Sequence, residues 1–281
     1  MILLRICLPE LFMKPSSRNN LNKILYDKQS GSTELLLKLI KWCKDNRSQK
    51  SRIKEMMNIA PSELATFTNI QTFINRLRIV IEENDDSTLK HFLDEEERII
   101  KTGYDTLFEN ALPYLKNFKR IVTISNSKTV SEILIRLNKY HKIHVMIGES
   151  RPKLEGRILA KKLLKKNIEV TIITDALLMN EVEKSDAVVI GADQVLINGN
   201  IVNKIGSRSL AVLCKYFGKP FYVLTSGNKF SKRKNYTPEE KDRNEIWNYN
   251  HRLLRKINYY FEVIEKEFIT GMITDEIKNQ K

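Results

Sequence analysis

Apolar residues recur at three- and four-residue spacings throughout residues 21–117, as on one face of an amphipathic helix. Ser32 and Thr33 stand where the first of these patterns begins, and both are residue types that cap helix N-termini. The polar segment 84–87 predicts a loop and a further helix cap. Strand-like runs are scarce here, so we expect a helical region. The spacing predicts helices over residues 33–44, 62–81 and 87–112.

From residue 118 onward the pattern changes to short β-branched runs separated by helical periodicity. Strands are predicted over residues 120–124, 143–147, 170–174, 187–190 and 221–224. Helices are predicted between them, over residues 129–139, 155–166 and 208–217. Strands that alternate with helices indicate a mostly parallel sheet covered on both faces. The expected fold class is therefore α/β, with an N-terminal helical domain followed by a Rossmann-like, mostly parallel sheet domain.

These patterns divide the chain into an N-terminal extension (1–20), a helical domain (21–117) and a Rossmann-like ligand-binding domain (118–281). The extension is apolar but lacks the basic start and small-residue cleavage site of a signal peptide. Met13 offers an alternative start, which leaves open whether residues 1–12 belong to the native product. No apolar run reaches the about 18 residues that a membrane span needs, so we expect no membrane association.

Charge and cysteine content bear on the compartment and the partners. The chain has 48 Lys and Arg residues against 34 Asp and Glu residues, a net charge of +14. This balance favours nucleic acid, phosphate ligands or acidic protein faces, or it reflects a solvated, lysine-rich surface, and the even spread of basic residues leaves both interpretations open. Three widely separated cysteines without metal-like spacing favour a reducing cytoplasm and predict neither a disulfide framework nor a metal site.

The region after residue 230 is polar at first and then aromatic. Residues 231–245 predict an exposed loop or a short helix. Residues 246–264 carry an aromatic cluster of the kind that more often packs in a core or forms an oligomer surface than stacks on nucleic-acid bases. The members of this cluster are Trp247, Tyr249, Tyr259, Tyr260 and Phe261.

Polar residues follow several of the predicted strands, and ligands of parallel sheets bind beyond the carboxyl ends of the strands. Asp193 is the only acid at the tip of its strand, so it is the candidate general acid or base. Ser125 offers a hydroxyl on the first of these loops. The neighbouring amide, hydroxyl and basic groups, with two helix N-termini, suit a phosphate-bearing ligand. The candidate phosphate-binding residues are Asn126, Ser127, Arg151, Asn203, Lys204 and Lys229.

Each of these residues also has a structural interpretation. A carboxylate such as Asp193 also caps turns, and Lys204 and Lys229 are two of many lysines. The pair Asn198-Gly199 between apolar runs predicts a two-residue hairpin with no functional content. The shared position of the candidates at strand ends favours a site over a set of unrelated structural roles.

The strand-end motifs combine into a longer pattern. They are Glu149-Ser150-Arg151-Pro152 with Gly156, Gly191-Ala192-Asp193, Asn198-Gly199, Asn203-Lys204-Ile205-Gly206-Ser207 and Asn228-Lys229-Phe230. This set resembles the translation initiation factor 2B α/β/δ family, which also contains ribose-1,5-bisphosphate isomerase and methylthioribose-1-phosphate isomerase. The resemblance covers nearly the whole chain from Ile24 and is most specific over residues 149–230. It implies a helical N-terminal domain, a Rossmann-like C-terminal domain, and homodimers or larger oligomers.

The resemblance also implies roles for individual residues. In the isomerase members a cysteine and an aspartate face the sugar phosphate and move a carbonyl between adjacent carbons. The aspartate corresponds to Asp193, whereas the position of the cysteine is occupied by Ser125. The isomerases also grip the phosphate with an Arg-Gly-Ala motif, and the corresponding segment here, Ser30-Gly31-Ser32, lacks the arginine. The phosphate contacts of the family correspond to Asn203, Lys204 and Lys229.

Ser125 is the departure on which the functional interpretation depends. A serine hydroxyl without a neighbouring base is a far poorer proton shuttle than a thiol of pKa ~8.5, and losing one positioned acid–base group costs ~10²–10⁴ in rate. We therefore expect a non-catalytic protein that resembles initiation factor 2B, binds initiation factor 2 or another protein, and holds a phosphorylated sugar or nucleotide. The alternative is an active aldose–ketose isomerase acting through Asp193, and a generic RNA binder is a third interpretation. None of the three calls for a cofactor, and we expect none.

Overall fold

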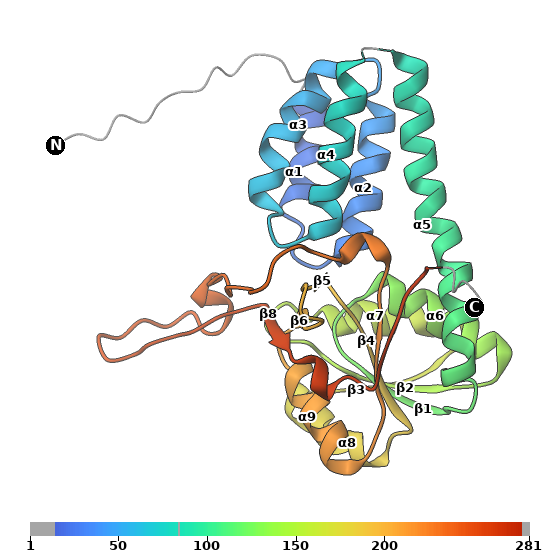
Figure 1. The fold of residues 1–281 in the computed structure, drawn as a ribbon. Helices are drawn as coiled ribbons and strands as arrows, with labels where there is room; N and C mark the ends of the chain where they lie inside the picture. The colour runs from blue at the N-terminus through green and yellow to red at the C-terminus, as the bar shows by residue number, and fades with distance from the viewer. Residues whose placement is uncertain (1–14, 84, 277–281) are drawn as a thin grey trace.

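The computed structural model describes residues 15–83 and 85–276, which form a helical half stacked on an α/β half (Figure 1). The predicted fold class is confirmed, because the second half contains a six-stranded parallel sheet. The alternative start at Met13 and most of the expected N-terminal extension lie outside the described residues. The helical half consists of α1 (Pro15–Leu25), α2 (Ser32–Asp45), α3 (Lys50–Glu63), α4 (Thr68–Glu82) and α5 (Asp86–Leu115).

The N-cap of α2 is formed by backbone alone, whereas the N-cap of α5 is formed by a side chain. The backbone of Gly31 forms the N-cap of α2 without a side-chain hydrogen bond, so the expectation that Ser32 or Thr33 caps this helix is wrong. Both residues are buried in the first turn instead. The cap predicted within residues 84–87 is confirmed, because the Asp85 carboxylate accepts hydrogen bonds from the Ser87 and Thr88 amides at 3.3 and 2.7 Å.

The helix predicted over residues 62–81 is wrong, because the chain turns between the end of α3 at Glu63 and the start of α4 at Thr68. Its apolar residues stay in phase across the turn, which is why the periodicity suggested one helix. The side chain of Gln71 stabilises the turn: its Nε2 donates to the carbonyl oxygens of Pro61 and Leu64 at 3.2 and 3.1 Å. Carbonyl groups at the end of a helix need such partners.

Helix α5 belongs to both halves of the molecule (Figure 1). Its first part places Leu89, Leu93 and Ile100 in the core of the helical half. Its last part places Leu107 and Leu115 in the core beneath the parallel sheet. One 30-residue helix therefore connects the two cores and fixes how the two halves lie relative to each other.

The parallel sheet follows the order β3-β2-β1-β4-β7-β9. Helices α6 and α7 cover one face together with the end of α5, and helices α8 and α9 cover the other. The sequence did not predict α8 or β9. The strands are β1 (Arg120–Thr123), β2 (His144–Gly148), β3 (Glu169–Ile173), β4 (Ala187–Gly191), β7 (Phe221–Leu224) and β9 (Gly271–Ile273). The helices are α6 (Lys128–Tyr140), α7 (Glu155–Leu164), α8 (Asp175–Lys184) and α9 (Ser207–Phe217).

The chain order reverses between β1 and β4. After β1 the chain adds β2 and β3 on one side, and it then returns to place β4, β7 and β9 on the other. Open parallel sheets bind ligands beyond the carboxyl ends of the strands at such a point. The loops that follow β1 and β4 carry Ser125 and Asp193, respectively.

A small antiparallel sheet adjoins this point and consists of β5 (Gln194–Val195), β6 (Ile201–Lys204) and β8 (Phe261–Ile264). The predicted hairpin at Asn198-Gly199 is present and connects β5 to β6, but its loop has three residues, 197–199, and not the expected two. Gly199 has a φ of +84°, a left-handed conformation that glycine adopts without steric cost. The Leu196 amide closes the turn on the Asn200 carbonyl at 2.8 Å.

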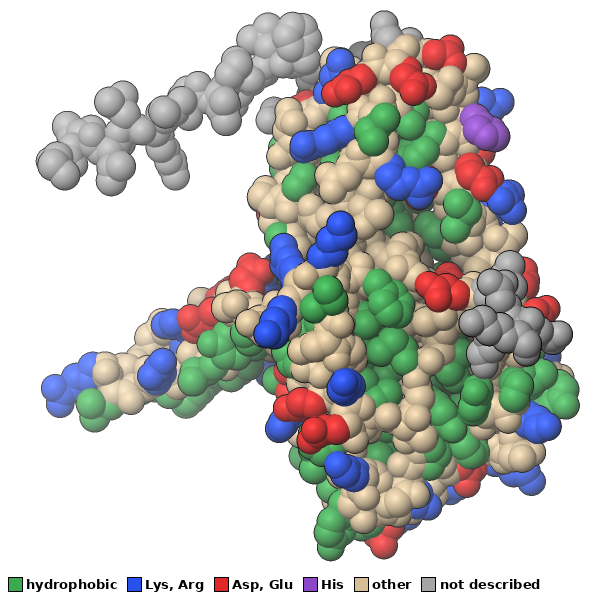
Figure 2. All heavy atoms as spheres, in the orientation of Figure 1, with side chains coloured by type: hydrophobic (Ala, Val, Ile, Leu, Met, Phe, Trp, Pro, Cys, Tyr) green, Lys and Arg blue, Asp and Glu red, His purple; other side chains and the backbone are tan. Residues whose placement is uncertain are grey.

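Residues 246–258 form an arm that projects from the body, and Figure 2 shows hydrophobic side chains along it. Residues 231–245 lead into it as an exposed loop with one 3₁₀ turn, η2 (Arg243–Glu245), in line with the predicted loop. The aromatic cluster divides between arm and body. Trp247 and Tyr249 stack on the arm with ring centroids 4.7 Å apart, whereas Tyr260 is buried beside β8.

Candidate functional site

A cavity of about 330 Å³ lies between the two halves, at the carboxyl ends of β1 and β4. Ser125 and Asp193 both line it, and both also line a smaller adjoining cavity of about 30 Å³. A volume of several hundred Å³ is typical of small-molecule sites. The helical half and the segments on either side of the arm contribute the other walls of the larger cavity. These walls include Leu25, Tyr26, Gln29, Leu64, Phe67, Glu239, Asp242, Tyr260 and Phe261.

Asp193 follows the fully buried strand β4, and its backbone amide is held by the Val202 carbonyl at 2.9 Å. Burial raises the pKa of its carboxyl group, and the positive charge of Lys229 opposes that shift only in part. A carboxyl whose pKa is raised by burial holds and releases protons nearer to neutral pH. Asp193 therefore has the environment of an acid–base group.

Ser125 is held in an unusual backbone conformation. Its φ of +67° lies in the left-handed region, which non-glycine residues occupy at a cost of order 1–3 kcal/mol. The Ser125 amide donates to Ser150 Oγ at 2.8 Å, and that hydroxyl donates to the Gly148 carbonyl at 3.1 Å. The loops after β1 and β2 thus hold the Ser125 side chain at the cavity.

The smaller cavity lies where two helices begin. Gly31, Ser32 and Thr33 approach it from the start of α2, and Ser127 and Lys128 from the start of α6. Backbone N–H groups and the helix dipole make such ends favourable for anions. The Ser127 hydroxyl accepts from the Val130 amide at 3.3 Å, so this candidate caps α6 while lining the cavity.

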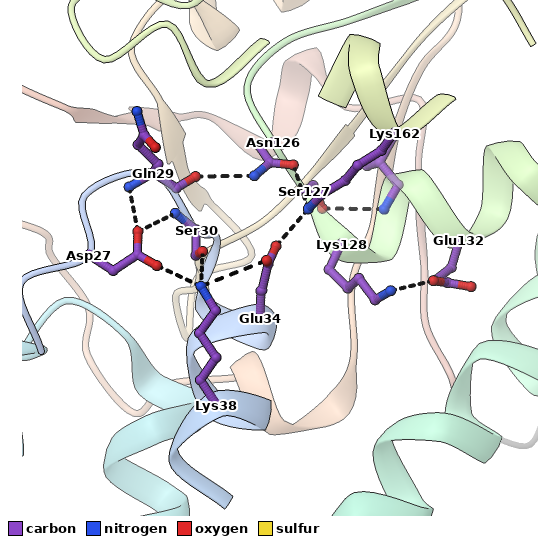
Figure 3. Close-up of polar contacts among 11 residues, drawn as sticks. Asp27, Gln29, Ser30, Glu34, Lys38, Asn126, Ser127, Lys128, Glu132 and Lys162 are labelled. Carbon is purple, nitrogen blue, oxygen red and sulfur yellow. Dashed lines mark hydrogen bonds and ion pairs between the residues drawn. The ribbon is translucent and has the colours of Figure 1, made fainter. Parts of the chain in front are cut away.

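Asn126 connects the two halves rather than presenting a free amide (Figure 3). Its Nδ2 donates to the Gln29 carbonyl at 3.1 Å, and its Oδ1 accepts from Lys162 at 3.2 Å. Lys162 also pairs with Glu34 of α2 at 2.7 Å. This network fixes the loop after β1 against the entry to α2.

Three further phosphate-binding candidates line the cavities, and the side chain of each is bonded to another residue of the protein. Asn203 Nδ2 donates to Ser207 Oγ at 2.9 Å. Lys229, in the 3₁₀ turn η1 (Gly227–Lys229), donates to the Ala192 carbonyl at 2.5 Å. Burial lowers the pKa of Lys229, and the nearby Asp193 carboxylate counteracts this. Lys204 pairs with a carboxylate, Glu155, at 2.8 Å.

Arg151 is not among the residues that line either cavity. Its backbone amide donates to Asp175 at 2.7 Å, as does the Ser150 amide at 2.8 Å, so Asp175 orders this loop. The Arg151 guanidinium reaches the carbonyl oxygens of Glu245 and Ile246, both at 3.4 Å, at the base of the arm.

Glu155 is a cavity residue that was not among the candidates drawn from the sequence. It is the first residue of α7, where an acid ordinarily complements the helix dipole, so its identity alone gave no functional signal. Burial raises the pKa of its carboxyl group, and Lys204 opposes the shift.

Glu245 joins separate segments and contacts two residues that line the larger cavity, Lys28 and Tyr260. Its carboxylate pairs with Lys153 at 2.5 Å and with Lys28 of the helical half at 3.3 Å, and it accepts from the hydroxyl of Tyr260. Burial alone would raise its pKa, but the Lys153 and Tyr260 contacts outweigh it and lower the pKa to about 2. The carboxylate therefore stays ionised at neutral pH and fixes the segment that leads into the arm.

Two broader features of the described residues bear on the possible activities. Over residues 15–83 and 85–276, no cluster of three or more His, Cys, Asp or Glu side chains has the arrangement of a metal site. None of the helices in these ranges is long and apolar enough to cross a membrane.

The sequence and the fold match a known class of proteins. Residues 19–276 match the model of the initiation factor 2 subunit family, and the chain belongs to this family. The expected family is thus confirmed.

Two relatives with similar sequences are both methylthioribose-1-phosphate isomerases. Methylthioribose-1-phosphate isomerase of Bacillus cytotoxicus is 29% identical over 255 residues, which is 81% of this chain and 72% of that protein. The enzyme of the same name from a Bacillus cereus strain is 30% identical over 238 residues, or 75% and 67% of the two chains.

Solved structures show the same fold. Translation initiation factor eIF-2B of Pyrococcus horikoshii superposes with a TM-score of 0.80 at 23% identity, covering 94% of this chain and 96% of that one. The 5-methylthioribose 1-phosphate isomerase of the same organism superposes with a TM-score of 0.77 at 20% identity, covering 92% and 83%.

Proposed function

We propose that this protein is a sugar-phosphate aldose–ketose isomerase in which Asp193 is the acid–base group. The observation that carries the proposal is a partly buried carboxyl with a raised pKa at the switch point of the sheet, lining a cavity of ligand size. The curated relatives named above are methylthioribose-1-phosphate isomerases at 29–30% identity, which favours an enzyme. The expectation of a non-catalytic protein gains no support from those relatives.

The proposed reaction moves one proton between adjacent carbon atoms. In a sugar 1-phosphate the first carbon carries the phosphate and has no free aldehyde, so the reaction begins when the bond between this carbon and the ring oxygen breaks and the ring oxygen takes a proton from solvent. The Asp193 carboxylate then removes the proton from the neighbouring, hydroxyl-bearing carbon, which gives an enol phosphate. The protonated carboxyl then returns this proton to the first carbon, and the neighbouring carbon becomes the ketone as its hydroxyl group releases a proton to solvent. One carboxylate with a raised pKa suits both halves of this transfer. The Ser125 hydroxyl lies where it can donate a hydrogen bond to a ligand oxygen.

The phosphate group of such a substrate fits the smaller cavity best. The starts of α2 and α6 supply backbone N–H groups there, and Lys229 supplies a buried positive charge. Together these groups take the place of the missing arginine in the segment Ser30-Gly31-Ser32. Lys204 is less suited to hold the phosphate, because Glu155 already neutralises it.

A second candidate function is the non-catalytic phosphosugar or nucleotide sensor that binds a protein such as initiation factor 2. The serine at position 125 favours it, because none of the described residues that line the two cavities is a cysteine. The ion pair between Glu155 and Lys204 favours it too, because it removes one free cation from the cavity.

The substitution Ser125→Cys separates the two candidates. A thiol of pKa ~8.5 exchanges protons near neutral pH far more readily than a serine hydroxyl, so we expect the isomerisation rate of an active enzyme to rise about tenfold or more. The measurement is turnover of 5-methylthioribose 1-phosphate and of ribose 1,5-bisphosphate. Ser231→Cys, which lies outside both cavities, serves as the control with an unchanged rate. Ligand binding without turnover in either protein would favour the sensor.

We also propose that the arm contacts a second copy of the chain, in keeping with the oligomers that the family resemblance implies. Trp247 and Leu253 on the arm are 57% and 80% exposed, and apolar surface of this kind is stabilised by a partner. The double substitution Trp247→Ser and Leu253→Ser is expected to shift the protein to a smaller species in sedimentation velocity. Tyr216→Ser on α9, where the side chain is also 80% exposed, should leave the species unchanged. An unchanged species in the arm variant would contradict the proposal.

A further inference from the structure

A glycine in the interior of the long helix α5 makes room for a carboxylate. Glycine is less favourable than alanine at such a position, and Gly103 therefore calls for a reason. A Cβ atom at Gly103 would lie 2.8 Å from Asp275 Oδ2, and its three nearest neighbours would all be atoms of Asp275. The Asp275 carboxylate thus packs against the helix backbone in space that only a glycine leaves open.

Asn110 of the same helix holds the backbone on either side of Asp275. Its Nδ2 donates to the carbonyl oxygens of Thr274 and Glu276, both at 2.9 Å. Residues seven positions apart lie on one face of a helix, so Gly103 and Asn110 contact the segment that follows β9 from one face of α5. Helix α5 thereby fixes where the Asp275 carboxylate lies.

The other oxygen of this carboxylate holds the 3₁₀ turn η1. Asp275 Oδ1 accepts a hydrogen bond from the amide of Gly227, the first residue of η1, at 2.9 Å. Lys229, the last residue of η1, is buried, and its ammonium group donates to the carbonyl oxygen of Ala192. Ala192 directly precedes Asp193. A chain of contacts therefore runs from α5 through Asp275 and η1 to the proposed acid–base group.

Lys229 influences Asp193 by its charge as well as by its position. Burial raises the pKa of Asp193, and the positive charge of Lys229 opposes this rise, followed by that of Lys204. Burial lowers the pKa of Lys229, which the carboxylates of Asp193 and Asp275 oppose. Tyr236 is a further ionisable neighbour of Asp193. Because the attraction between charges falls with distance, a shift of η1 would change the proton affinity of Asp193.

We infer that Asp275 is a positioning residue, which holds η1 so that Lys229 stays beside Asp193. The inference rests on the acid–base role proposed above for Asp193. Asp275 lines neither of the two cavities described above, so it acts through Lys229 and not on a ligand. Gly103 belongs to the same arrangement, because a side chain at this position would displace the carboxylate.

The test compares Asp275→Ala with Asp275→Asn. Both substitutions remove the charge, but only asparagine retains an oxygen that accepts from the Gly227 amide, so the difference between them reports on this hydrogen bond. Small displacements of site groups cost up to about 100-fold in rate. We expect Asp275→Ala to lower kcat/KM about tenfold or more and Asp275→Asn to stay within about threefold of the wild type. Glu276→Ala removes the adjacent, exposed carboxylate and should behave as the wild type.

Gly103→Ala tests the same contact from the side of α5. The added Cβ displaces the Asp275 carboxylate, whereas alanine in a helix interior otherwise stabilises the helix. We expect kcat/KM to fall as it does in Asp275→Ala. This variant keeps the test decisive if Asp275→Ala does not fold.

The pKa of Asp193 gives a readout that needs no turnover. It is followed by ¹³C NMR of the carboxyl carbons, and the spectrum of Asp193→Asn identifies the resonance. When Lys229 moves away, the carboxylate loses a favourable charge, so the pKa of Asp193 rises in Asp275→Ala and in Gly103→Ala but not in Asp275→Asn. The acid limb of kcat/KM moves to higher pH with it, because ionised Asp193 begins the proton transfer. A purely structural role would lower stability and leave this pKa unchanged.

The outcomes separate the two proposals. The same pKa of Asp193 in Asp275→Ala, Asp275→Asn and the wild type overturns the positioning role, whatever the turnover. A folded Gly103→Ala protein with the Asp193 pKa and the kcat/KM of the wild type overturns it too. A wild-type protein without turnover overturns the isomerase function, and the NMR comparison then still decides the role of Asp275.

Discussion

Replacing Asp193 by asparagine is expected to reduce isomerase turnover about 10²–10⁴-fold, which is the usual contribution of a positioned acid–base group. The amide keeps the size and hydrogen-bonding reach of the side chain but neither accepts nor returns a carbon-bound proton. Because the phosphate contacts proposed above come from the starts of α2 and α6 and from Lys229, we expect binding of the substrate to change less than about threefold. The measurement is a progress curve for ketose formation, with binding followed by calorimetry.

Asp242→Asn is the matched control for this variant. Asp242 also lines the cavity, and its carboxylate accepts from the Asn244 amide at 2.9 Å at the start of η2. It is expected to retain wild-type turnover, because an exposed turn-capping carboxylate takes no part in the reaction. Equal losses in both variants would point to a disturbed cavity rather than to acid–base chemistry, and an Asp193→Asn variant with full turnover would contradict the mechanism.

Gly156→Ala is expected to cause the largest loss of stability. A Cβ atom at this position would lie 1.9 Å from the Gly148 carbonyl oxygen and 3.1 Å from Ser150 Oγ. Both the end of β2 and the start of α7 must move to admit it, and the closest atom is backbone. We expect the free energy of unfolding to fall by about 3 kcal/mol or more, which corresponds to a drop of roughly 6–12 °C in melting temperature.

Gly227→Ala provides the comparison for the glycine variant. At Gly227 the nearest atom to an added Cβ is Glu276 Oε1 at 3.4 Å, an ordinary contact. Its melting temperature should therefore lie within about 2 °C of the wild type. A Gly156→Ala protein as stable as Gly227→Ala would show that α7 is free to shift, which would contradict its close packing on the end of β2.

The sequence predicted the parts of the fold that depend on periodicity. The five strands drawn from short apolar runs correspond to β1, β2, β3, β4 and β7. Four of them are central strands with mostly buried apolar residues, as is typical of parallel sheets, whereas β3 is an exposed edge strand that was found from its β-branched residues. The break at residues 64–67 was missed for two reasons. The apolar positions stay in phase across it, and the side chain that stabilises the turn, Gln71, belongs to the helix that follows. The short helix α8 has only two buried positions, Leu178 and Val182, so it offers little periodicity to detect.

The site was predictable to the extent that it depends on strand ends. Ser125 and Asp193 follow different strands, and the rule for parallel sheets brought them to one cavity. The contacts of the other candidates depend on tertiary neighbours that no local pattern reveals. Lys204 pairs with Glu155, 49 residues away, and Asn126 binds Gln29 and Lys162. Glu155 stayed hidden because the start of a helix is an ordinary place for an acid.

The most direct test of the proposed function is conversion of 5-methylthioribose 1-phosphate by the wild-type protein, followed by ¹³C NMR. Enzymes typically turn over at about 1–10³ s⁻¹, and a site without the thiol is expected to work toward or below the low end of this range. The proposed mechanism predicts a growing ketone carbonyl signal that is lost in Asp193→Asn. A wild-type protein that binds the sugar phosphate yet gives no more ketone than buffer alone would contradict it.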